Sequence, residues 1–488
     1  MIKELIKHER ARPSSSSTNS SNTDVFLSDK SRLIYSSAFR RLQQKAQVFS
    51  LESNSAVRSR LTHSLEVAHI GRSLVAAVEA ELSANCHGED IYKEWRDELS
   101  TIMTIVETSC LMHDLGNPPF GHFCEAAISQ WFKSEECDEI IKKALTGEVN
   151  ENDLSLDDFC NFDGNPQGLR IATKLQGDDG ETGLNLTYTQ LASFIKYVAG
   201  PSERNPNEKF KKKVGYFSTE KELYENIYKT HGMPLNSRHP FAFLMEAADD
   251  ISYCISDIED GIEKKVITEN SFFEYFFDNF RAAFQSVNSD FKSRVDNLIE
   301  DTKERIANEK NGKEVVIRPF LNLKTKLSSL CVKEAARLFV LNRQEIFLFS
   351  FHQPIIDGKK DLNKLLEILK GYTRQNVFSS YEAESMEISG FSIVSGILSS
   401  YKKLLILDRN KFKKIVDGVT DKNDDLDVEV RLFNRLPERY VKAYSKAECN
   451  SSIGREWNLR AHLVIDFIAG MTDNFALDTY KMLHGIRL

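Results

Sequence analysis

A short segment at residues 110–128, CLMHDLGNPPFGHFCEAAI, concentrates side chains that could do chemistry. His113 and Asp114 end an apolar run, a Gly-Asn-Pro-Pro break follows, and His122 and Glu125 come soon after it. Imidazole and carboxylate groups bind divalent ions of the Mg/Mn/Fe class, which keep coordination positions for water or substrate. Adjacent side chains lie about 100° apart around a helix, so this His-Asp pair reaches one ion only where the helix ends. The segment indicates a metal site, with packing or polar capping of a helix end as alternatives.

Two further ligands must come from other parts of the chain. His63, in RLTHSLEV, lies near the start of an expected helix, and Asp249, in EAADDISY, lies mid-helix among Ala and Ile. A carboxylate in such surroundings is costly unless it is paired or bound to a metal. Taken singly, each residue is better explained as a surface or hydrogen-bonded group, and Asp250 competes with Asp249. The order His, His-Asp, Asp, with each member on a helix, favours a shared metal site.

The elements that must position these residues are predicted to be helices. Apolar spacing typical of α-helices recurs in the segments 29–49, 58–82, 101–116, 121–132, 186–198, 239–264 and most of 270–410. Gly116 and the two prolines after it are expected to end the helix that carries His113. The turn-rich region 160–190 is expected to be a surface loop, and strand-like alternation is confined to VGYF at 214–217. We therefore expect an all-α fold with little β-structure.

The composition is typical of a soluble globular protein and argues against a membrane-spanning or disulfide-rich one. The 488 residues are 41% hydrophobic and 28% charged, as in soluble globular proteins, and no apolar run is long enough to cross a bilayer. The N-terminal residues lack the apolar core of a signal peptide, so we expect a cytoplasmic protein without membrane contact. Eight scattered cysteines without a CxxC pair indicate reduced thiols. A formal net charge of −8 argues against a surface devoted to nucleic acid but permits local basic patches.

Several longer motifs carry a family resemblance. They are SAFRRLQQKAQVF, RSRLTHSLEV, HDLGNPPFGHFCE, FDGNPQG, MEAADDISY and FIAGMTDNFALDTY. With them the chain resembles the HD superfamily of metal-dependent phosphohydrolases, and within it the enterobacterial-type deoxyguanosine triphosphate (dGTP) triphosphohydrolases. The resemblance implies an HD-domain helical core with additional helices and long loop insertions. It also implies hydrolysis of dGTP to deoxyguanosine and inorganic triphosphate by water attack at the α-phosphorus, which controls dNTP pools.

The chain is expected to divide into three parts. Residues 12–23, RPSSSSTNSSNT, are too polar to pack, so residues 1–28 are expected to be a mobile segment. By the resemblance, residues 29–270 form the phosphohydrolase core. Residues 271–488 are expected to be a helical region that packs on this core and completes the nucleotide pocket.

The resemblance implies four metal ligands: His63, His113, Asp114 and Asp249. The metal would be Mg²⁺, Mn²⁺ or another transition metal. His122 and Glu125 would be the catalytic pair, because an imidazole that titrates near neutral pH suits proton transfer or water positioning. Glu125, three residues further along the helix, faces the same way and can orient the ring. Whether His122 acts as acid, base or orienter stays open, and the plain alternative is a helix cap with a favourable dipole contact.

The resemblance also assigns the substrate contacts: Gln47, Tyr253 and Asp257 to the deoxyribose, Asn165, Lys196, Tyr197 and Lys213 to the triphosphate, and Val48 and Glu387 to guanine. An aromatic ring against C2′ rejects ribonucleotides by a clash, although core packing explains Tyr253 equally well. Lys211 and Lys212 leave the choice of lysine open. A carboxylate can accept hydrogen bonds from guanine N1–H and N2–H₂, but an exposed glutamate on a helix is commonplace. Arg58 and Arg60 support phosphate, support the ligand carboxylates, or form salt bridges.

Two other functions stay open at this point. One is a broader dNTP triphosphohydrolase, or an HD nucleotidase or phosphodiesterase, which the several candidate triphosphate contacts disfavour. The other is a regulatory protein that binds single-stranded DNA and has a secondary HD site. Family members include such binders, and Arg40, Arg41 and the FKKK run at 210–213 could contribute to a basic surface. Relatives assemble as oligomers, often hexamers, so the resemblance also implies a homo-oligomer.

Overall fold

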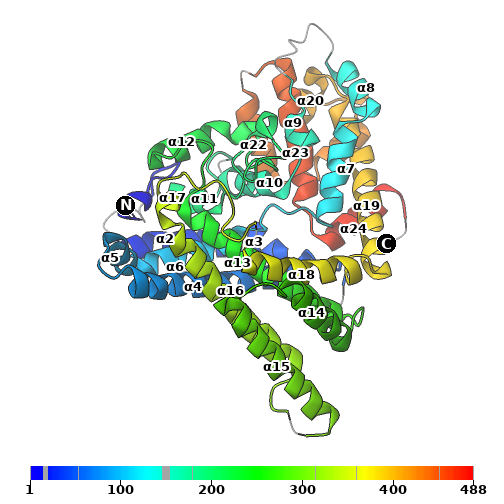
Figure 1. The fold of residues 1–488 in the computed structure, drawn as a ribbon. Helices are drawn as coiled ribbons and strands as arrows, with labels where there is room; N and C mark the ends of the chain where they lie inside the picture. The colour runs from blue at the N-terminus through cyan, green and yellow to red at the C-terminus, as the bar shows by residue number, and fades with distance from the viewer. Residues whose placement is uncertain are drawn as a thin grey trace.

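The computed structural model describes residues 2–14, 20–52, 54–145, 154–177, 180–313, 315–358, 360–449 and 451–486. Over this part of the chain the protein is built from helices (Figure 1), and extended segments pair only in isolated bridges. The expected all-α fold is confirmed. The strand expected at 214–217 was wrong: Val214 makes a single bridge with Ala199. The aromatic residues that produced the alternation are buried by ring stacking instead, as between Tyr216 and Tyr224 with centroids 4.0 Å apart.

Three long helices form the centre of the N-terminal half: α4 (Arg60–Asn85), α6 (Leu99–Met112) and α13 (Pro240–Glu263). They pack against one another, with α4 in contact with both of the others. α4 begins with a capping box in which Ser59 and Thr62 satisfy backbone N–H groups at the helix start. The apolar face formed by Val67, Leu74, Val75, Val78 and Leu82 is buried, which fixes the rotation of the helix about its axis. This arrangement places the start of α4, the end of α6 and the middle of α13 together.

Helices from the second half of the chain cover this centre. α16 (Pro319–Leu341) lies along α4, and α18 (Asp361–Asn376) packs on α13 beside α14 (Glu269–Ala283). α15 (Asp290–Lys310) pairs with α16 and projects away from the body of the molecule, as Figure 1 shows.

The C-terminal helices gather around α7 (His122–Phe132), the helix that follows the Gly-Asn-Pro-Pro break. α19 (Tyr381–Leu405) runs along α7, and both α23 (Ile453–Ala469) and α24 (Asp473–Leu483) pack on α19. The buried Trp457 anchors α23 through an Nε1–H bond of 2.9 Å to the Leu405 carbonyl. These contacts bring chain from opposite ends of the sequence to one place. The division at residues 28 and 270 stays a prediction.

The other helices are α1 (Ile2–Leu5), α2 (Asn22–Ile34), α3 (Ser37–Arg41), α5 (Asp90–Asp97), α8 (Glu135–Ala144), α9 (Asp157–Cys160), α10 (Gly164–Arg170), α11 (Tyr188–Phe194), α12 (Lys221–His231), α17 (Arg343–Phe347), α20 (Arg409–Asp417), α21 (Asp427–Phe433) and α22 (Glu438–Glu448). Short 3₁₀ turns cover Leu42–Gln44, Pro201–Glu203, Ser218–Glu220 and Lys422–Asp424, and a π-helical turn covers Ile171–Leu175. No single helix of the described residues is long and apolar enough to span a membrane; α19 and α20 meet that test only as a pair bent by 98°.

The N-terminal residues are more ordered than their composition suggested. α1 buries Ile2, and Arg10 forms a buried ion pair of 2.5 Å with Asp29. α2 begins at Asn22, before the expected start of order at Asp29. The described residues of the segment 1–28 therefore pack on the core, because scattered apolar and charged side chains there find partners. Residues 15–19, at the centre of the serine-rich stretch, lie outside the described residues.

The region 160–190 is also different from the expected surface loop. Its first part forms α10 and the π-helical turn, and both are largely buried. Gly164 allows close packing in this region: a Cβ on it would lie 2.2 Å from Asn117 Oδ1, and a Cβ on Gly116 would lie 2.0 Å from the Gly164 carbonyl oxygen. α10 thus presses directly against the Gly-Asn-Pro-Pro break. Residues 178–179 lie outside the described residues.

Candidate active site

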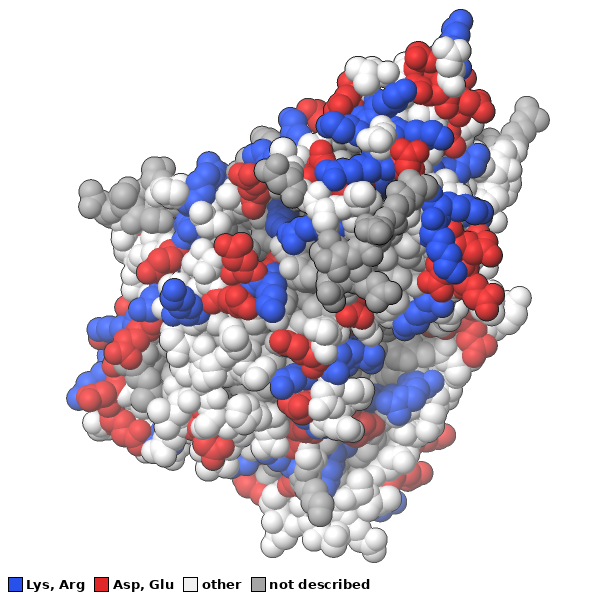
Figure 2. Space-filling model, turned by 90° about the horizontal axis from the view of Figure 1, so that it is seen from above, with Lys and Arg blue, Asp and Glu red and all other residues white. Residues whose placement is uncertain are grey.

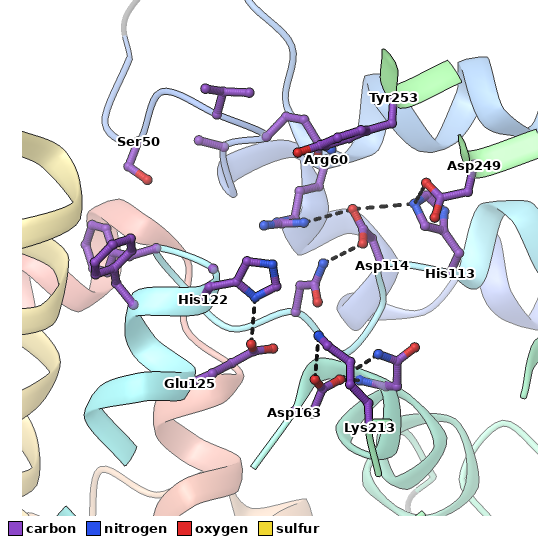
Figure 3. A pocket seen from close by; sticks show the side chains of 18 of the residues that line it. Ser50, Arg60, His113, Asp114, His122, Glu125, Asp163, Lys213, Asp249 and Tyr253 are labelled. Carbon is purple, nitrogen blue, oxygen red and sulfur yellow. Dashed lines mark hydrogen bonds and ion pairs between the residues drawn. The ribbon is translucent and has the colours of Figure 1, made fainter. Parts of the chain in front are cut away.

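A cavity of about 390 Å³ lies where α4, α6, α7, α13 and α19 approach one another (Figure 3). It gathers residues that are far apart in the sequence. Of the predicted site residues, His63 and Asp257 are fully buried behind the cavity wall. The others all line the cavity: Gln47, Val48, His113, Asp114, His122, Glu125, Asn165, Lys196, Tyr197, Lys213, Asp249, Tyr253 and Glu387.

Three of the predicted metal ligands form a compact cluster. Ligand atoms of His63, His113 and Asp249 all lie within 4.8 Å of one another, and each histidine Nε2 lies 3.5 or 3.6 Å from Asp249 Oδ1. His63 is fully buried, yet neither of its ring nitrogens has a hydrogen-bond partner among the described residues. His113 donates from Nδ1 to the Cys110 carbonyl at 2.7 Å, which leaves the Nε2 lone pair facing Asp249. This donor set fits a divalent cation.

Asp114, the fourth predicted ligand, has other partners. Its Oδ2 lies 3.6 Å from His113 Nε2 but accepts a 2.8 Å hydrogen bond from Arg60, and its Oδ1 accepts one from the Asn117 side chain. Burial raises the pKa of Asp114, but His113 and Arg60 outweigh it and hold the pKa below the ordinary value. Asp114 is therefore charged and close to the cluster, although its carboxylate is engaged elsewhere.

The backbone break places the two halves of the site on either side of one turn. α6 ends with His113 as its C-cap, and the chain then turns through Phe120 and Gly121, which have φ angles of 59° and 55°. Only glycine adopts such a conformation readily, so Phe120 is strained there. α7 begins at the next residue, His122. The turn explains how adjacent segments present predicted metal ligands and then a second imidazole to one cavity.

His122 and Glu125 form a dyad. His122 Nδ1 and Glu125 Oε2 are 2.7 Å apart (Figure 3). Glu125 Oε1 also accepts a 2.8 Å hydrogen bond from the Gly164 backbone N–H. The side chain of His122 is 80% exposed, whereas that of Glu125 is 12% exposed. The hydrogen bond and charge of Glu125 raise the pKa of His122 above its ordinary value. A fixed carboxylate thus orients an imidazole that remains open to the cavity.

The basic side chains of the cavity are each held by a carboxylate. Lys196 Nζ lies 3.1 Å from Asp249 Oδ2, and Lys213 Nζ lies 2.7 Å from Asp163 Oδ2. Of the three consecutive lysines, only Lys213 lines the cavity. Lys211 pairs with Glu208 at 3.0 Å, and Lys212 lies over the ring of Tyr197. The structure therefore separates the lysines that the sequence left open.

The predicted sugar and base contacts differ in whether they reach the cavity. Tyr253 lines the cavity, with its ring centroid 6.4 Å from that of Phe378. Asp257 lies one turn further along α13, is fully buried, and neither of its carboxylate oxygens has a hydrogen-bond partner among the described residues. Burial raises its pKa to about 8. Glu387 on α19 also lines the cavity, and burial raises its pKa as well.

The structure adds residues that the sequence reasoning missed. Asp163 accepts hydrogen bonds from the Asn165 backbone and side chain and pairs with Lys213, so one carboxylate holds two predicted phosphate contacts. Asn117 holds Asp114. Both residues stand in the recognised motifs FDGNPQG and HDLGNPP, which could have drawn attention to them. Phe378 and Met386 also line the cavity, and no pattern in the sequence signalled them.

Known proteins resemble this chain over nearly its whole length. The chain is 34% identical, over 98% of its length, to the deoxyguanosinetriphosphate triphosphohydrolase of Salmonella typhimurium, and the match covers 97% of that relative. The chain belongs to the deoxyguanosinetriphosphate triphosphohydrolase family. The family member from Klebsiella pneumoniae is 33% identical over 95% of this chain and 94% of its own length. The phosphohydrolase-associated domain matches residues 430–482.

In this triphosphohydrolase-family chain, the associated segment includes α22, α23 and α24. Asp466 on α23 is buried and accepts hydrogen bonds from the Arg170 guanidinium at 2.7 to 3.0 Å and from Gln167 at 3.0 Å. Both donors lie on α10, the helix that carries Asn165 near its start. The segment therefore anchors α10 against the cavity.

Proposed function

We propose that this protein hydrolyses dGTP to deoxyguanosine and inorganic triphosphate, with a divalent cation bound by His63, His113, Asp114 and Asp249. One observation supports this most. A single cavity collects the histidine–aspartate cluster, the His122–Glu125 dyad and two lysines, in a chain that aligns with dGTP triphosphohydrolases over 98% of its length. Mg²⁺ and Mn²⁺ both suit this mixed imidazole and carboxylate set.

The cation, when bound, polarises the α-phosphate and lowers the pKa of a water molecule. In the reaction a bond forms between the water oxygen and the α-phosphorus while the bond from phosphorus to the 5′-oxygen breaks, and that oxygen takes up a proton. His122 has Nδ1 engaged with Glu125, so Nε2 is free either to deliver this proton or to hold the attacking water. Glu125 keeps the ring in the orientation that this requires.

The triphosphate is bound by positive charge and amide donors. Lys196, Lys213 and Asn165 line the cavity near the metal cluster, and Tyr197 lies beside them. Their carboxylate partners, Asp249 and Asp163, hold these groups in place before substrate arrives. Preorganised cations of this kind stabilise the negative charge on the phosphate oxygens as water attacks the α-phosphorus and the 5′-oxygen of deoxyguanosine leaves.

The nucleoside end of the substrate is assigned to the other side of the cavity. Tyr253 would pack against C2′ of the deoxyribose and exclude a 2′-hydroxyl, with Gln47 also beside the sugar and Asp257 buried one turn behind Tyr253. Val48 and Glu387 would contact guanine, with the carboxylate of Glu387 accepting from N1–H and N2–H₂. Val48, Tyr253 and Glu387 line the same cavity, which supports this orientation. Homo-oligomer formation and binding of single-stranded DNA remain predictions.

The decisive experiment is a product analysis in ¹⁸O-labelled water. Purified protein with Mg²⁺ or Mn²⁺ is incubated with each dNTP and rNTP. The proposal expects deoxyguanosine and triphosphate from dGTP, with one ¹⁸O atom in the triphosphate because water attacks phosphorus. Stepwise release of phosphate or pyrophosphate would contradict it, and equal turnover of all dNTPs would identify a broader triphosphohydrolase. Tight binding of single-stranded DNA without turnover would favour the regulatory protein.

The His122→Ala variant tests the role of the dyad. Turnover should be abolished while the metal content stays that of the wild type, because His122 lies outside the metal cluster. Metal content is measured by elemental analysis of the purified variant. Loss of the metal would mean that His122 is a ligand and not a catalytic residue.

A further inference from the structure

A buried carboxylate from the C-terminal segment connects two loops of the cavity. Asp473 Oδ2 accepts a hydrogen bond of 3.0 Å from the Ala46 backbone N–H, and Oδ1 accepts one of 3.1 Å from the Phe120 N–H. The two donors are distant in sequence from each other and from Asp473, which is 3% exposed. No cation lies in contact with this carboxylate among the described residues, so its two oxygens serve the two loops.

The neighbouring Lys45 makes a complementary pair of bonds. Its Nζ donates to the Asn117 carbonyl at 2.6 Å and to the Ala469 carbonyl at 3.0 Å, and the side chain is 3% exposed. Burial lowers the pKa of Lys45 to about 7. A neutral amine still has two N–H donors, which equals the number of carbonyls that it serves. Two buried groups thus join three stretches of chain: residues 45–46, 117–120 and 469–473.

These bonds are not required by the helix to which Asp473 belongs. α24 is capped by Thr472, whose side chain accepts from the Phe475 N–H. The carboxylate of the following residue is therefore not needed to satisfy the start of its own helix. Burial raises the pKa of Asp473 above its ordinary value, so its placement costs stability. A costly buried carboxylate that caps nothing in its own element points to a role in the loops that it contacts.

One of the two loops precedes the proposed nucleoside contacts, and the other precedes the proposed catalytic imidazole. Ala46 directly precedes Gln47 and Val48, which line the nucleoside side of the cavity. Phe120 lies two residues before His122, at a φ of 59° that a phenylalanine adopts only under constraint. The bond from its N–H to Asp473 supplies part of that constraint. A shift of either loop would move the base and sugar contacts relative to the imidazole.

We propose that Asp473 and Lys45 are positioning residues that hold the nucleoside-binding loop and the His122 turn in register. This inference rests on the proposed dGTP hydrolysis and assigns the phosphohydrolase-associated segment a direct part in it. Neither residue lines the cavity or touches the substrate site. They act through the backbone of residues 46 and 117–120.

The test combines two variants with a matched control. Asp473→Asn keeps the volume but turns one acceptor into a donor, so one of the two backbone N–H groups loses its partner. Lys45→Met removes both donors and keeps an unbranched apolar stem. Glu456→Gln is the control: Glu456 lies in the same segment and is 1% exposed, and among the described residues its carboxylate bonds to Arg460 and Tyr444 and to neither loop. All three change a buried charge, but only the first two touch the loops.

Two readouts are needed. Amide hydrogen exchange, followed by mass spectrometry of peptides covering residues 44–50 and 117–123, should show faster exchange in Asp473→Asn and Lys45→Met but not in Glu456→Gln. With saturating dGTP, kcat of the two loop variants should fall about 10- to 100-fold, as expected for a misplacement of about 1 Å, while the control keeps the wild-type kcat. Metal content should be unchanged in all three.

The outcomes separate this inference from the proposed function. Wild-type kcat in both loop variants, or a loss of activity and protection equal to that of Glu456→Gln, would overturn the positioning role. Absence of dGTP hydrolysis by the wild-type protein would instead overturn the proposed function, and the exchange measurement would still report whether Asp473 and Lys45 hold the loops. If Asp473→Asn does not fold, Lys45→Met decides both readouts.

Discussion

Replacing Asp257 with asparagine should make the metal-free protein more stable at neutral and alkaline pH, although it removes a predicted substrate contact. Asp257 is fully buried on α13, and its oxygens have no hydrogen-bond partner among the described residues. Asparagine has nearly the same shape and cannot ionise. The comparison therefore isolates the cost of placing an ionisable carboxyl in this position.

The size of the effect follows from the pKa of Asp257, which burial raises from 3.8 to about 8. At pH 7 the folded protein keeps the carboxyl protonated, whereas the unfolded chain releases the proton. Stability is lost progressively as pH rises from 3.8 towards 8, because the folded state binds more protons than the unfolded state over that interval. With about 1.36 kcal/mol for each pH unit above the ordinary pKa, the penalty at pH 7 is on the order of 4 kcal/mol.

The assay is urea or thermal unfolding of chelator-treated wild type and Asp257→Asn at several pH values. The two proteins should have the same stability near pH 4. The advantage of the variant over the wild type should grow steadily up to pH 8 and persist above pH 8. Asp260→Asn is the control, because Asp260 is equally buried on the same helix but accepts a 2.7 Å hydrogen bond from Arg58. Its replacement should destabilise the protein. A variant of Asp257 that is less stable than the wild type at pH 8 would refute the reasoning.

Three further predictions concern the cavity. Asp163→Asn should raise KM for dGTP more than it lowers kcat, because Lys213 and Asn165 lose their shared partner; steady-state kinetics at saturating metal measure this. Glu125→Gln should lower the pKa of His122 towards 6.5, so the inflection of the pH–rate profile should move to lower pH. An inflection that does not move would show that it reports a group other than His122. Chelation should stop turnover and Mn²⁺ or Mg²⁺ should restore it, except in a His63→Ala variant, whose cluster lacks one ligand.

The parts of the site that were predictable from sequence depend on local patterns. The helices that carry His63, His113 and Asp249 have long apolar stripes, and those helices are present. The break after Asp114 was predictable because two prolines and a glycine cannot continue a helix. The pairing of His122 with Glu125 follows from a spacing of three residues on one helix face.

The remaining features depend on long-range contacts that no local pattern encodes. Asp163 and Asp473 stand in the motifs FDGNPQG and FIAGMTDNFALDTY, but the bonds that they make depend on how α10 and α24 pack against the cavity. The region 160–190 was misread because a sequence rich in Gly and Asp suits a turn and a closely packed helix equally well. Phe378 lies in the connection between α18 and α19, Met386 lies near the start of α19, and both line the cavity only because these parts of the chain pack beside it.

Arg60 should affect metal binding and substrate binding in opposite directions. In this structure its guanidinium lines the cavity and donates to Asp114 Oδ2 at 2.8 Å, so it competes for an oxygen that the proposed metal would bind. Arg60→Gln removes a cation beside the ligand carboxylate, and metal affinity should rise about tenfold, close to the worth of one hydrogen bond to a charged group. KM for dGTP should rise, because the cavity loses one positive charge near the triphosphate.

Lys213→Met is the matched variant, since Lys213 lines the same cavity but pairs with Asp163 and not with a metal ligand. Lys213→Met should raise KM for dGTP without increasing the affinity for the metal. Metal affinity is measured by calorimetric titration of chelator-treated protein with Mn²⁺. Weaker metal binding in Arg60→Gln would mean that Arg60 orients Asp114 for the metal instead of competing with the metal. The hydrogen bond between Arg60 and Asp114 would then also be present when the metal is bound.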